Sequence, residues 1–423
     1  MENKTIWIMN HYAGHMFFDQ SGRHYWFAKY LSRAGWKVKV FCANVVSDDT
    51  KSKHFESDEL YIEQQDNKES IEFIFVKART YDGNGIQRVM NMIDFYRNIK
   101  KTVNVYIKHY GKPDIILASS VHPLTLVAGI QLAQKMKIHC ICEVRDLWPE
   151  AIVAYSSRIK RSSLIAKVMY AGEKWIYKKA ACVIFTQEGG PQYVIDQKWT
   201  DIDGGPIKID NLYHINNGVD LETFNNNLNT YWYEDKDLED ETKFKVIYTG
   251  AIRRINNLGI ILDAAKKIKN PNIQFIIFGD GNELPALKQR VIDENIENVV
   301  FKGHVKRQYI PSILTRSDLN LVHWEMNPLL HVGESYNKAF EYFAARKPVL
   351  YTVKPGYSII EKYHCGMIVD GFSPDRIAEK IDAIATMDKS EIEVMEHNTE
   401  EVTKDYNFTV LTEKLIKILN KYM

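Results

Sequence analysis

Short apolar runs alternate with amphipathic stretches along the whole chain. The first run covers residues 4–9, and after a loop a helical pattern extends from Gly22 to Ala34, where Gly35 is predicted to end it. Residues 37–42 then form a second apolar run. A strand, a glycine-bearing loop, a helix and a second strand make up the βαβ unit of a doubly wound sheet.

The same alternation continues and predicts two Rossmann-like domains in tandem, at residues 1–215 and 216–402. An Asn-rich and then acidic segment, up to Glu241, is interpreted as the linker. A last amphipathic helix, residues 403–423, is expected to pack back on the first domain. Further strands are expected at 71–76, 114–120, 138–144, 181–187, 245–250, 275–278, 298–305 and 317–324.

Polar residues directly follow two of these strands, at the edge where open α/β sheets bind ligands. His122 comes after one of them, and Arg145 and Asp146 come after the next. Two structural alternatives remain open, because a single His is often structural and because Asp146 could cap the helix that Pro149 begins.

The first loop combines glycines with aromatic side chains. Gly14 and Gly22 would let the backbone approach a ligand closely, although the spacing is not G-x-G-x-x-G. Tyr12, Phe17 and Phe18 either line a pocket or pack against the edge of the sheet.

Residues 334–350 read as a loop, a helix and a buried strand. Phe340 and Phe343 define the buried face of the helix, whereas Lys338 and Glu341 lie three residues apart on another face. A helix N-terminus with an added lysine suits a phosphate, and a carboxylate one turn on suits the hydroxyls of a ribose. The alternative is a solvated Lys/Glu pair on a surface helix.

Composition limits the class of protein. The chain of 423 residues has 55 basic and 54 acidic residues, with the basic excess in its first half, which suits a domain that faces an anionic surface. Its five cysteines show no disulfide framework and predict reduced thiols in the cytoplasm. No segment predicts a signal peptide or membrane span, but the basic amphipathic stretch 158–179 either lies on an anionic membrane or is an ordinary helix with a solvated basic face.

Several segments together resemble one family. INNGVDLETF, VIYTG, FGDGNELPAL, VVFKGHV and KAFEYFAARKPVL occur here in the order found in the retaining family-4 glycosyltransferases, and EVRDLWPE resembles the branch that builds bacterial surface polysaccharides such as O-antigen, lipopolysaccharide and capsule. The resemblance covers essentially the whole chain. It implies an α/β GT-B fold, with two Rossmann-like domains facing across a cleft, a nucleotide-sugar donor on the second domain, an acceptor against the first, and no metal or other cofactor.

The resemblance also implies roles for individual residues. Glu341 matches the ribose-binding glutamate, Lys338 a residue near the donor diphosphate, and Gly22 the glycine of the first-domain loop. The expected catalytic residues are Arg145, Asp146, Arg253 and Lys338; the expected donor-binding residues are Gly22, Gly250, Arg254, Asn257, Gly279, Glu334, Asn337 and Glu341; Tyr12 and His122 are expected on the acceptor side.

The chain departs from the family pattern in two places. Glu334 precedes Glu341 by six intervening residues instead of seven, and Ala251 and Asn257 occupy positions where the family commonly has Arg and Lys. Either Arg253 or Arg254 could replace the missing charge on the leaving diphosphate.

The resemblance implies transfer of a sugar, with retention, from a UDP-sugar to a glycan or a polyprenyl-diphosphate-linked acceptor. An N-acetylated aminodeoxy sugar is the expected group, the cytoplasmic face of the membrane is the expected location, and no nucleic acid is an expected partner. Two alternatives are a UDP-sugar 2-epimerase and a non-catalytic relative that binds a nucleotide sugar within a polysaccharide assembly.

Overall fold

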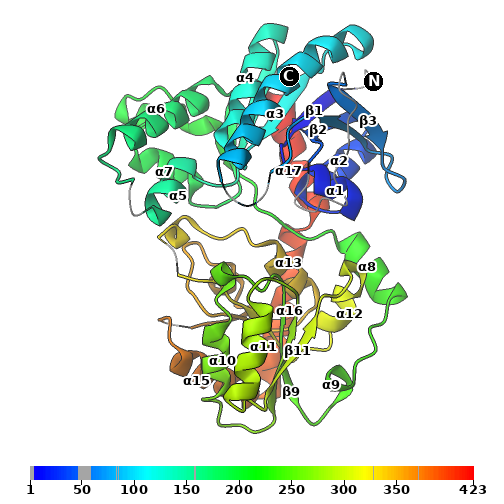
Figure 1. Ribbon diagram of the computed structural model, residues 1–423, viewed down its shortest axis with the longest axis vertical. Helices are drawn as coiled ribbons and strands as arrows, with labels where there is room; N and C mark the ends of the chain where they lie inside the picture. Colours follow the sequence, from blue (N-terminus) through cyan, green and yellow to red (C-terminus); the bar gives the residue numbers. More distant parts are fainter. Residues whose placement is uncertain are drawn as a thin grey trace. The chain divides into compact units, whose positions relative to one another are not determined.

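The computed structural model describes residues 4–45, 59–81, 83, 85–156, 159–326, 328–369 and 371–423. The chain forms two compact units, Met1–Asn216 with Leu411–Met423, and Asn217–Val410 (Figure 1). Among the helices of the described ranges, none is both long and apolar enough to span a bilayer.

The first unit is built on a sheet that, within the described residues, has the strand order β3-β4-β2-β1-β5-β6-β7-β8. All neighbours pair in parallel except β3, which runs antiparallel to β4. The order reverses on either side of β1, which places a ligand-binding edge at the carboxyl ends of β1 and β5. The strands are β1 (Thr5–Met9), β2 (Lys37–Ala43), β3 (Tyr61–Gln65), β4 (Glu72–Val76), β5 (Ile115–Ser119), β6 (His139–Val144), β7 (Cys182–Phe185) and β8 (Leu212–His214).

The first loop contains a helix that the sequence pattern did not predict, α1. The predicted helix after it begins at Arg23, with Gly22 as its N-cap at a φ of 108°, a conformation that favours glycine. The helices of this unit are α1 (Gly14–Asp19), α2 (Arg23–Arg33), α3 (Ile86–Tyr110), α4 (Pro123–Met136), α5 (Trp148–Tyr155), α6 (Leu164–Lys179) and α7 (Gly190–Asp196), with most of α17 (Phe408–Lys421).

The second unit has a parallel sheet with the order β11-β10-β9-β12-β13-β14 in the described part of the chain. Here the order reverses at β9, so the loops after β9, β10 and β12 meet at one edge. The strands are β9 (Phe244–Thr249), β10 (Ile273–Phe278), β11 (Val299–Gly303), β12 (Leu319–Val322), β13 (Val349–Tyr351) and β14 (Gly366–Ile368).

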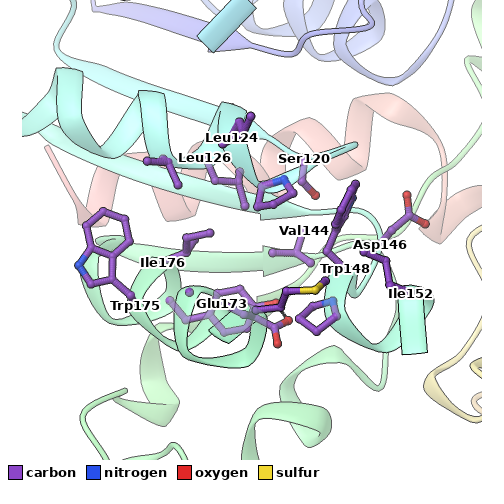
Figure 2. Close-up of a pocket in the computed structure, with 16 residues that line it drawn as sticks. Ser120, Leu124, Leu126, Val144, Asp146, Trp148, Ile152, Glu173, Trp175 and Ile176 are labelled. Carbon is purple, nitrogen blue, oxygen red and sulfur yellow. Dashed lines mark hydrogen bonds between the residues drawn. The ribbon is translucent and has the colours of Figure 1, made fainter. Parts of the chain in front are cut away.

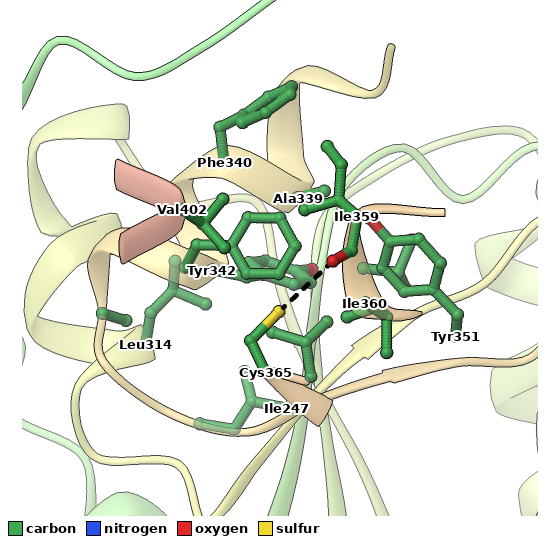
Figure 3. Packing of buried hydrophobic residues seen from close by; sticks show 14 of the residues in the cluster. Ile247, Leu314, Ala339, Phe340, Tyr342, Tyr351, Ile359, Ile360, Cys365 and Val402 are labelled. Carbon is green, nitrogen blue, oxygen red and sulfur yellow. Dashed lines mark hydrogen bonds between the residues drawn. The ribbon is translucent and has the colours of Figure 1, made fainter. Parts of the chain in front are cut away.

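Apolar side chains of both helices and strands close the core of the second unit. Figure 3 shows one cluster, in which Phe340 and Tyr342 of α13 pack with Ile247, Tyr351 and Cys365. The helices are α8 (Leu221–Thr230), α9 (Lys236–Glu239), α10 (Gly259–Ala265), α11 (Leu284–Asp293), α12 (Ile310–Leu314), α13 (Asn337–Ala344), α14 (Ile359–Tyr363), α15 (Pro374–Ala385) and α16 (Lys389–Asp405).

The acidic segment is not the linker that its composition suggested. It belongs to the second unit, which begins at residue 217, and it contains the short helix α9. Lys302 on β11 holds it in place through ion pairs to Asp235 at 2.6 Å and to Asp237 at 2.5 Å. The acidic residues therefore serve local attachment rather than separation of the units.

The C-terminal segment consists of two helices instead of the single helix expected from residue 403. Helix α16 ends at Asp405, and the backbone N–H of Phe408 donates to the carbonyl of Val219 at 3.0 Å, which starts α17 afresh. At the far end of α17, Asn420 accepts a hydrogen bond from Lys4 at 2.8 Å. The last residues thus pack within the first unit.

Candidate functional site

In the second unit, the loops after β9 and β10 lie directly against each other. Gly250 N–H donates to the carbonyl of Phe278 at 3.0 Å, and a Cβ at Gly279 would lie 1.8 Å from the carbonyl oxygen of Gly250. Gly279 also has a φ of 141°, which side chains rarely adopt. These two predicted donor-binding glycines are thus brought together and leave backbone exposed to a ligand.

Helix α13 is fixed to the end of β9 by a buried tyrosine. The Tyr342 hydroxyl accepts from the Thr249 N–H at 2.8 Å and donates to the Thr249 carbonyl at 3.0 Å. This anchor ties α13 to the end of β9, directly before the Gly250 loop. Asn337, a predicted donor-binding residue, is the exposed first residue of this helix.

Lys338 is placed beside the glycine loops. Its Nζ lies 3.1 Å from the Tyr248 hydroxyl and 4.2 Å from the centroid of the same ring, and a Cβ at Gly250 would lie 3.5 Å from it. Within the described part of the chain, no carboxylate pairs with this ammonium group. Removal from water lowers the pKa of Lys338 to about 7, so a bound anion would restore its charge.

Glu341 and Glu334 have different surroundings. Glu341 pairs with Arg307 at 2.6 Å, with the guanidinium 55% and the carboxylate 22% exposed, so a ligand can reach this ion pair. Glu334 is buried, and its Oε1 accepts the backbone N–H of Ile359 at 2.9 Å, at the start of α14. This contact gives Glu334 a structural partner, and its role toward a sugar stays a prediction.

The two arginines expected to replace the missing family charge lie on the loop after Gly250. Arg253 and Arg254 are both exposed, and neither forms an ion pair in the described part of the chain. Asn257 ends this turn in the left-handed conformation, and its carbonyl accepts a hydrogen bond from Nε2 of His323 at 3.1 Å. Burial lowers the pKa of His323 to about 4, so it is a neutral support of the loop.

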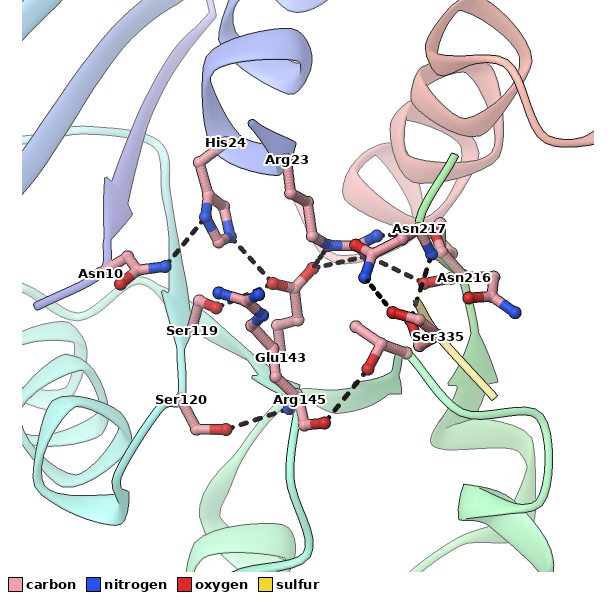
Figure 4. A network of polar contacts seen from close by, with 12 residues as sticks. Asn10, Arg23, His24, Ser119, Ser120, Glu143, Arg145, Asn216, Asn217 and Ser335 are labelled. Carbon is pink, nitrogen blue, oxygen red and sulfur yellow. Dashed lines mark hydrogen bonds and ion pairs between the residues drawn. The ribbon is translucent and has the colours of Figure 1, made fainter. Parts of the chain in front are cut away.

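The first unit holds a buried ionic network at the carboxyl ends of β5 and β6 (Figure 4). Glu143 accepts from Arg23 at 2.8 Å, from His24 at 2.8 Å and from the Ser119 hydroxyl at 2.8 Å. Burial alone would raise the pKa of Glu143, but Arg23 and His24 hold it well below the usual range. Arg23 also donates to the Asn216 carbonyl at 2.6 Å, which ties α2 to the end of the first unit.

Tyr12 and His122, both predicted on the acceptor side, lie together. Nε2 of His122 is 2.6 Å from Nδ1 of His11. The ring of His11 stacks on that of Tyr12, with the ring centroids 4.4 Å apart, and Arg88 donates to the Tyr12 hydroxyl at 3.2 Å. Burial lowers the pKa of His122 to about 3, so one neutral imidazole donates to the other. Nδ1 of His122 is buried and has no hydrogen-bond partner in the described ranges.

Arg145 and Asp146 follow β6 as expected, but Asp146 does not cap the next helix. The N-cap of α5 is Leu147, which makes no side-chain capping hydrogen bond, and Pro149 in the first turn has no N–H that needs a partner. Asp146 is exposed and Arg145 is half-buried. The Arg145 backbone is fixed by the Ser120 hydroxyl, which accepts its N–H at 3.1 Å.

An apolar pocket of about 540 Å³ lies between α4, α5 and α6 (Figure 2). Glu173, one of the lining residues, accepts hydrogen bonds from the hydroxyls of Tyr177 and Tyr193, both at 2.7 Å. Burial raises the pKa of Glu173 to about 7. The pocket is lined by Ser120, Pro123, Leu124, Leu126, Val127, Val144, Asp146, Trp148, Pro149, Ile152, Met169, Gly172, Glu173, Trp175, Ile176 and Tyr177.

Sequence reasoning missed the partners that define both sites. Tyr248, Arg307 and His323 in the second unit lie far along the chain from the residues they contact, and no local spacing marks them. His11 was marked only by its place in the first loop, and Glu143 only by its position within β6. No group of three or more His, Cys, Asp or Glu residues in the described ranges is placed to hold a metal ion.

A known protein family matches most of the second unit. Residues 233–405 match the family model described as glycosyl transferases group 1. No curated protein matches the chain.

Solved structures match the whole chain. The sucrose-phosphate synthase of Thermosynechococcus elongatus is 17% identical with a TM-score of 0.70, over 99% of each chain. The Anabaena protein HepE in complex with UDP-glucose is 14% identical with a TM-score of 0.64, over 99% of each chain. A trehalose-6-phosphate protein of Escherichia coli bound with UDP-2-fluoro glucose is 11% identical with a TM-score of 0.71, over 99% of this chain and 100% of the other.

These likenesses extend over nearly the full length of both partners and concern the fold. Together with the two largely parallel sheets, they confirm the predicted fold class, an α/β GT-B fold of two units.

Proposed function

We propose that the protein is a glycosyltransferase that moves a sugar from a UDP-sugar to an acceptor, with retention and without a metal ion. One observation carries this proposal: the ammonium group of Lys338 lies beside the glycine loops, and no carboxylate in the described part of the chain pairs with it. A cation at the N-terminal end of a helix, next to exposed backbone, suits a diphosphate. The match of residues 233–405 to glycosyl transferases group 1 supports the same reading.

In this mechanism, Lys338 and one of Arg253 and Arg254 stabilise the departing UDP, and Glu341 binds the ribose hydroxyls. The acceptor hydroxyl attacks the face that the diphosphate leaves. Loss of a charge at the leaving group lowers kcat by about 10²–10³-fold, by analogy with an oxyanion donor. Arg145, Asp146, Tyr12 and His122 remain predictions for the reacting carbon and the acceptor side.

For the acceptor we propose a sugar carried on a polyprenyl diphosphate, used in surface-polysaccharide synthesis at the inner face of the membrane. The segment EVRDLWPE and the order of the other motifs support this choice, as does the basic character of α6. An N-acetylated aminodeoxy sugar is the proposed group.

A thermal-shift panel of UDP, GDP, ADP and CMP tests the donor site. A ligand at a hundredfold its Kd adds about 2.7 kcal/mol to stability, which raises Tm by roughly 5–10 °C. We expect a shift with UDP alone, lost in Glu341→Ala and kept in the surface variant Lys354→Ala as a control. Absence of a shift with every nucleotide would refute the donor site.

A second candidate is a relative that binds nucleotide sugar but does not transfer it. Ala251 and Asn257, at positions where the resembled family has charged residues, favour it. Incubation with UDP-sugars distinguishes the two. Release of UDP, through transfer or slow hydrolysis, supports the enzyme, whereas binding without turnover against a polyprenyl-diphosphate sugar supports the second candidate.

A further inference from the structure

The apolar pocket of the first unit is a built cavity, and among its lining residues only Asp146 has a part in the proposed chemistry. Its volume, about 540 Å³, falls in the range of small-molecule sites, and its walls come from three helices, α4, α5 and α6. Nearly all of the surface that lines it is apolar. The indole N–H of Trp148 adds no free polar group, because it donates to the carbonyl of Val121 at 2.6 Å. A pocket of this kind selects hydrocarbon over polar groups.

Helix α6 presents an exposed apolar face next to this pocket. Leu164, Ile165, Val168 and Trp175 are 77%, 60%, 64% and 37% exposed. At 3.6 residues per turn, these positions fall on one side of the helix, and Gly172 lies on the same side. Trp175, labelled in Figure 2, and Gly172 also line the pocket, so the exposed face borders it.

Lysines accompany this face. Lys160, Lys167, Lys178 and Lys179 form no ion pair within the described ranges, and all four are solvent-exposed. A helix with exposed large apolar residues flanked by unpaired lysines complements the surface of an anionic bilayer. A protein partner would need matching acidic groups, whereas a bilayer supplies apolar chains and anionic headgroups together.

We propose that α6 lies on the membrane surface and that the apolar pocket takes the isoprenoid chain of a membrane-borne acceptor. This inference deepens the proposed function and rests on it for the identity of the acceptor. The chain passes from the bilayer over the exposed face of α6 and enters at Gly172, where the absence of a side chain leaves the rim open. The phosphate end stays outside, because the almost wholly apolar lining would leave an anion without its hydration.

Isoprenoid phosphates of increasing length test the pocket by calorimetry, below the concentration at which they aggregate. Each buried methylene strengthens binding by about fourfold, so farnesyl phosphate should bind at least tenfold more tightly than geranyl phosphate, and inorganic phosphate should not bind. Equal affinity for the two chains would overturn the proposal.

Gly172→Phe supplies the matching perturbation. A Cβ at this position has no heavy atom within 4 Å and its φ is ordinary, so the helix accepts the change while the ring blocks the rim. We expect a loss of at least tenfold in affinity for farnesyl phosphate, whereas Gly172→Ala should stay within about twofold. Unchanged binding in Gly172→Phe would overturn the assignment of the pocket.

Vesicle sedimentation tests the exposed face. The protein should bind vesicles of phosphatidylcholine mixed with phosphatidylglycerol more than vesicles of phosphatidylcholine alone, and the combined change Leu164→Ser, Ile165→Ser and Val168→Ser should abolish the binding. Equal binding by that variant would overturn the membrane contact. Because UDP binds the second unit in the proposal, its thermal shift in every variant reports the donor site separately, and chain binding without a UDP shift would refute the donor and leave the pocket standing.

Discussion

In the proposed donor site, the lowered pKa of Lys338 predicts that nucleotide binding depends on pH in a defined direction. In the free protein, burial brings this pKa to about 7, so the ammonium group is half deprotonated at that pH. A bound diphosphate favours the charged form and raises the pKa again. Above pH 7, binding must therefore take up a proton, and affinity falls as pH rises.

The size of the effect follows from the pKa alone. The apparent Kd increases by the factor 1 + 10^(pH − pKa), so it rises about fiftyfold between pH 7 and pH 9, or about 2.3 kcal/mol. The phosphates of UDP contribute little over this range, because their second ionisation lies near pH 6 and is largely complete above 7.

Titration calorimetry with UDP at pH 7, 8 and 9, in two buffers of different ionisation heat, measures both the Kd and the protons taken up. Lys338→Arg keeps its charge throughout and should give a flat profile, and Lys338→Met should bind weakly and equally at all three values. A wild-type Kd that does not change with pH would refute the reasoning, as would the same slope in Lys338→Met.

Three further predictions concern other contacts. Glu173 keeps its proton to about pH 7 in the folded protein but releases it near pH 4.5 in the unfolded chain. The free energy of unfolding should therefore fall by about 3 kcal/mol as pH rises between these two values. Urea titrations at pH 5 and 8 measure this fall, which Glu173→Gln should remove. Arg307→Ala frees Glu341 from an exposed ion pair worth about 0.2–1 kcal/mol. In calorimetry, UDP should therefore bind this variant as tightly as wild type or up to about fivefold more tightly. A tenfold loss of affinity would contradict the ribose role of Glu341. Gly279→Ala should destabilise by about 1–3 kcal/mol in urea unfolding, because its Cβ meets the Gly250 carbonyl and its φ is unfavourable, whereas Gly172→Ala should not destabilise.

The sequence pattern predicted the fold well where local signals coincide with packing. The strands predicted from residues 4, 37, 114 and 138 are found within a residue or two, because short apolar runs bounded by turn residues are typical of buried parallel strands. The pattern failed where a tertiary contact decides the outcome. The acidic segment folds onto Lys302 through an ion pair. The predicted C-terminal helix is interrupted where the N–H of Phe408 donates to the carbonyl of Val219.

The candidate site was predictable only in part, for the same reason. Spacing on one helix pointed to Lys338 and Glu341, and glycines after strands pointed to Gly250 and Gly279. The partners that set the chemistry come from elsewhere in the chain. Nothing near Lys338 in sequence indicates that the ring of Tyr248 will lie beneath it, or that burial will lower its pKa.

The cations of the second unit differ in how they are held, and this difference predicts how each affects the reaction. Lys338 rests on Tyr248. In the proposed mechanism, its contact with the diphosphate therefore forms when the donor binds and strengthens as the leaving group gains charge. Arg253 and Arg254 are exposed and unpaired within the described ranges, and exposed charges add little to binding in the ground state. Lys338→Met should therefore raise KM and lower kcat, whereas Arg253→Ala and Arg254→Ala should leave KM within about twofold, and the one that faces the leaving group should lower kcat. Steady-state kinetics of all three variants measures KM and kcat. An unchanged kcat in both arginine variants would contradict a role for either arginine in the proposed mechanism and leave Lys338 as the one side-chain charge assigned to the departing UDP.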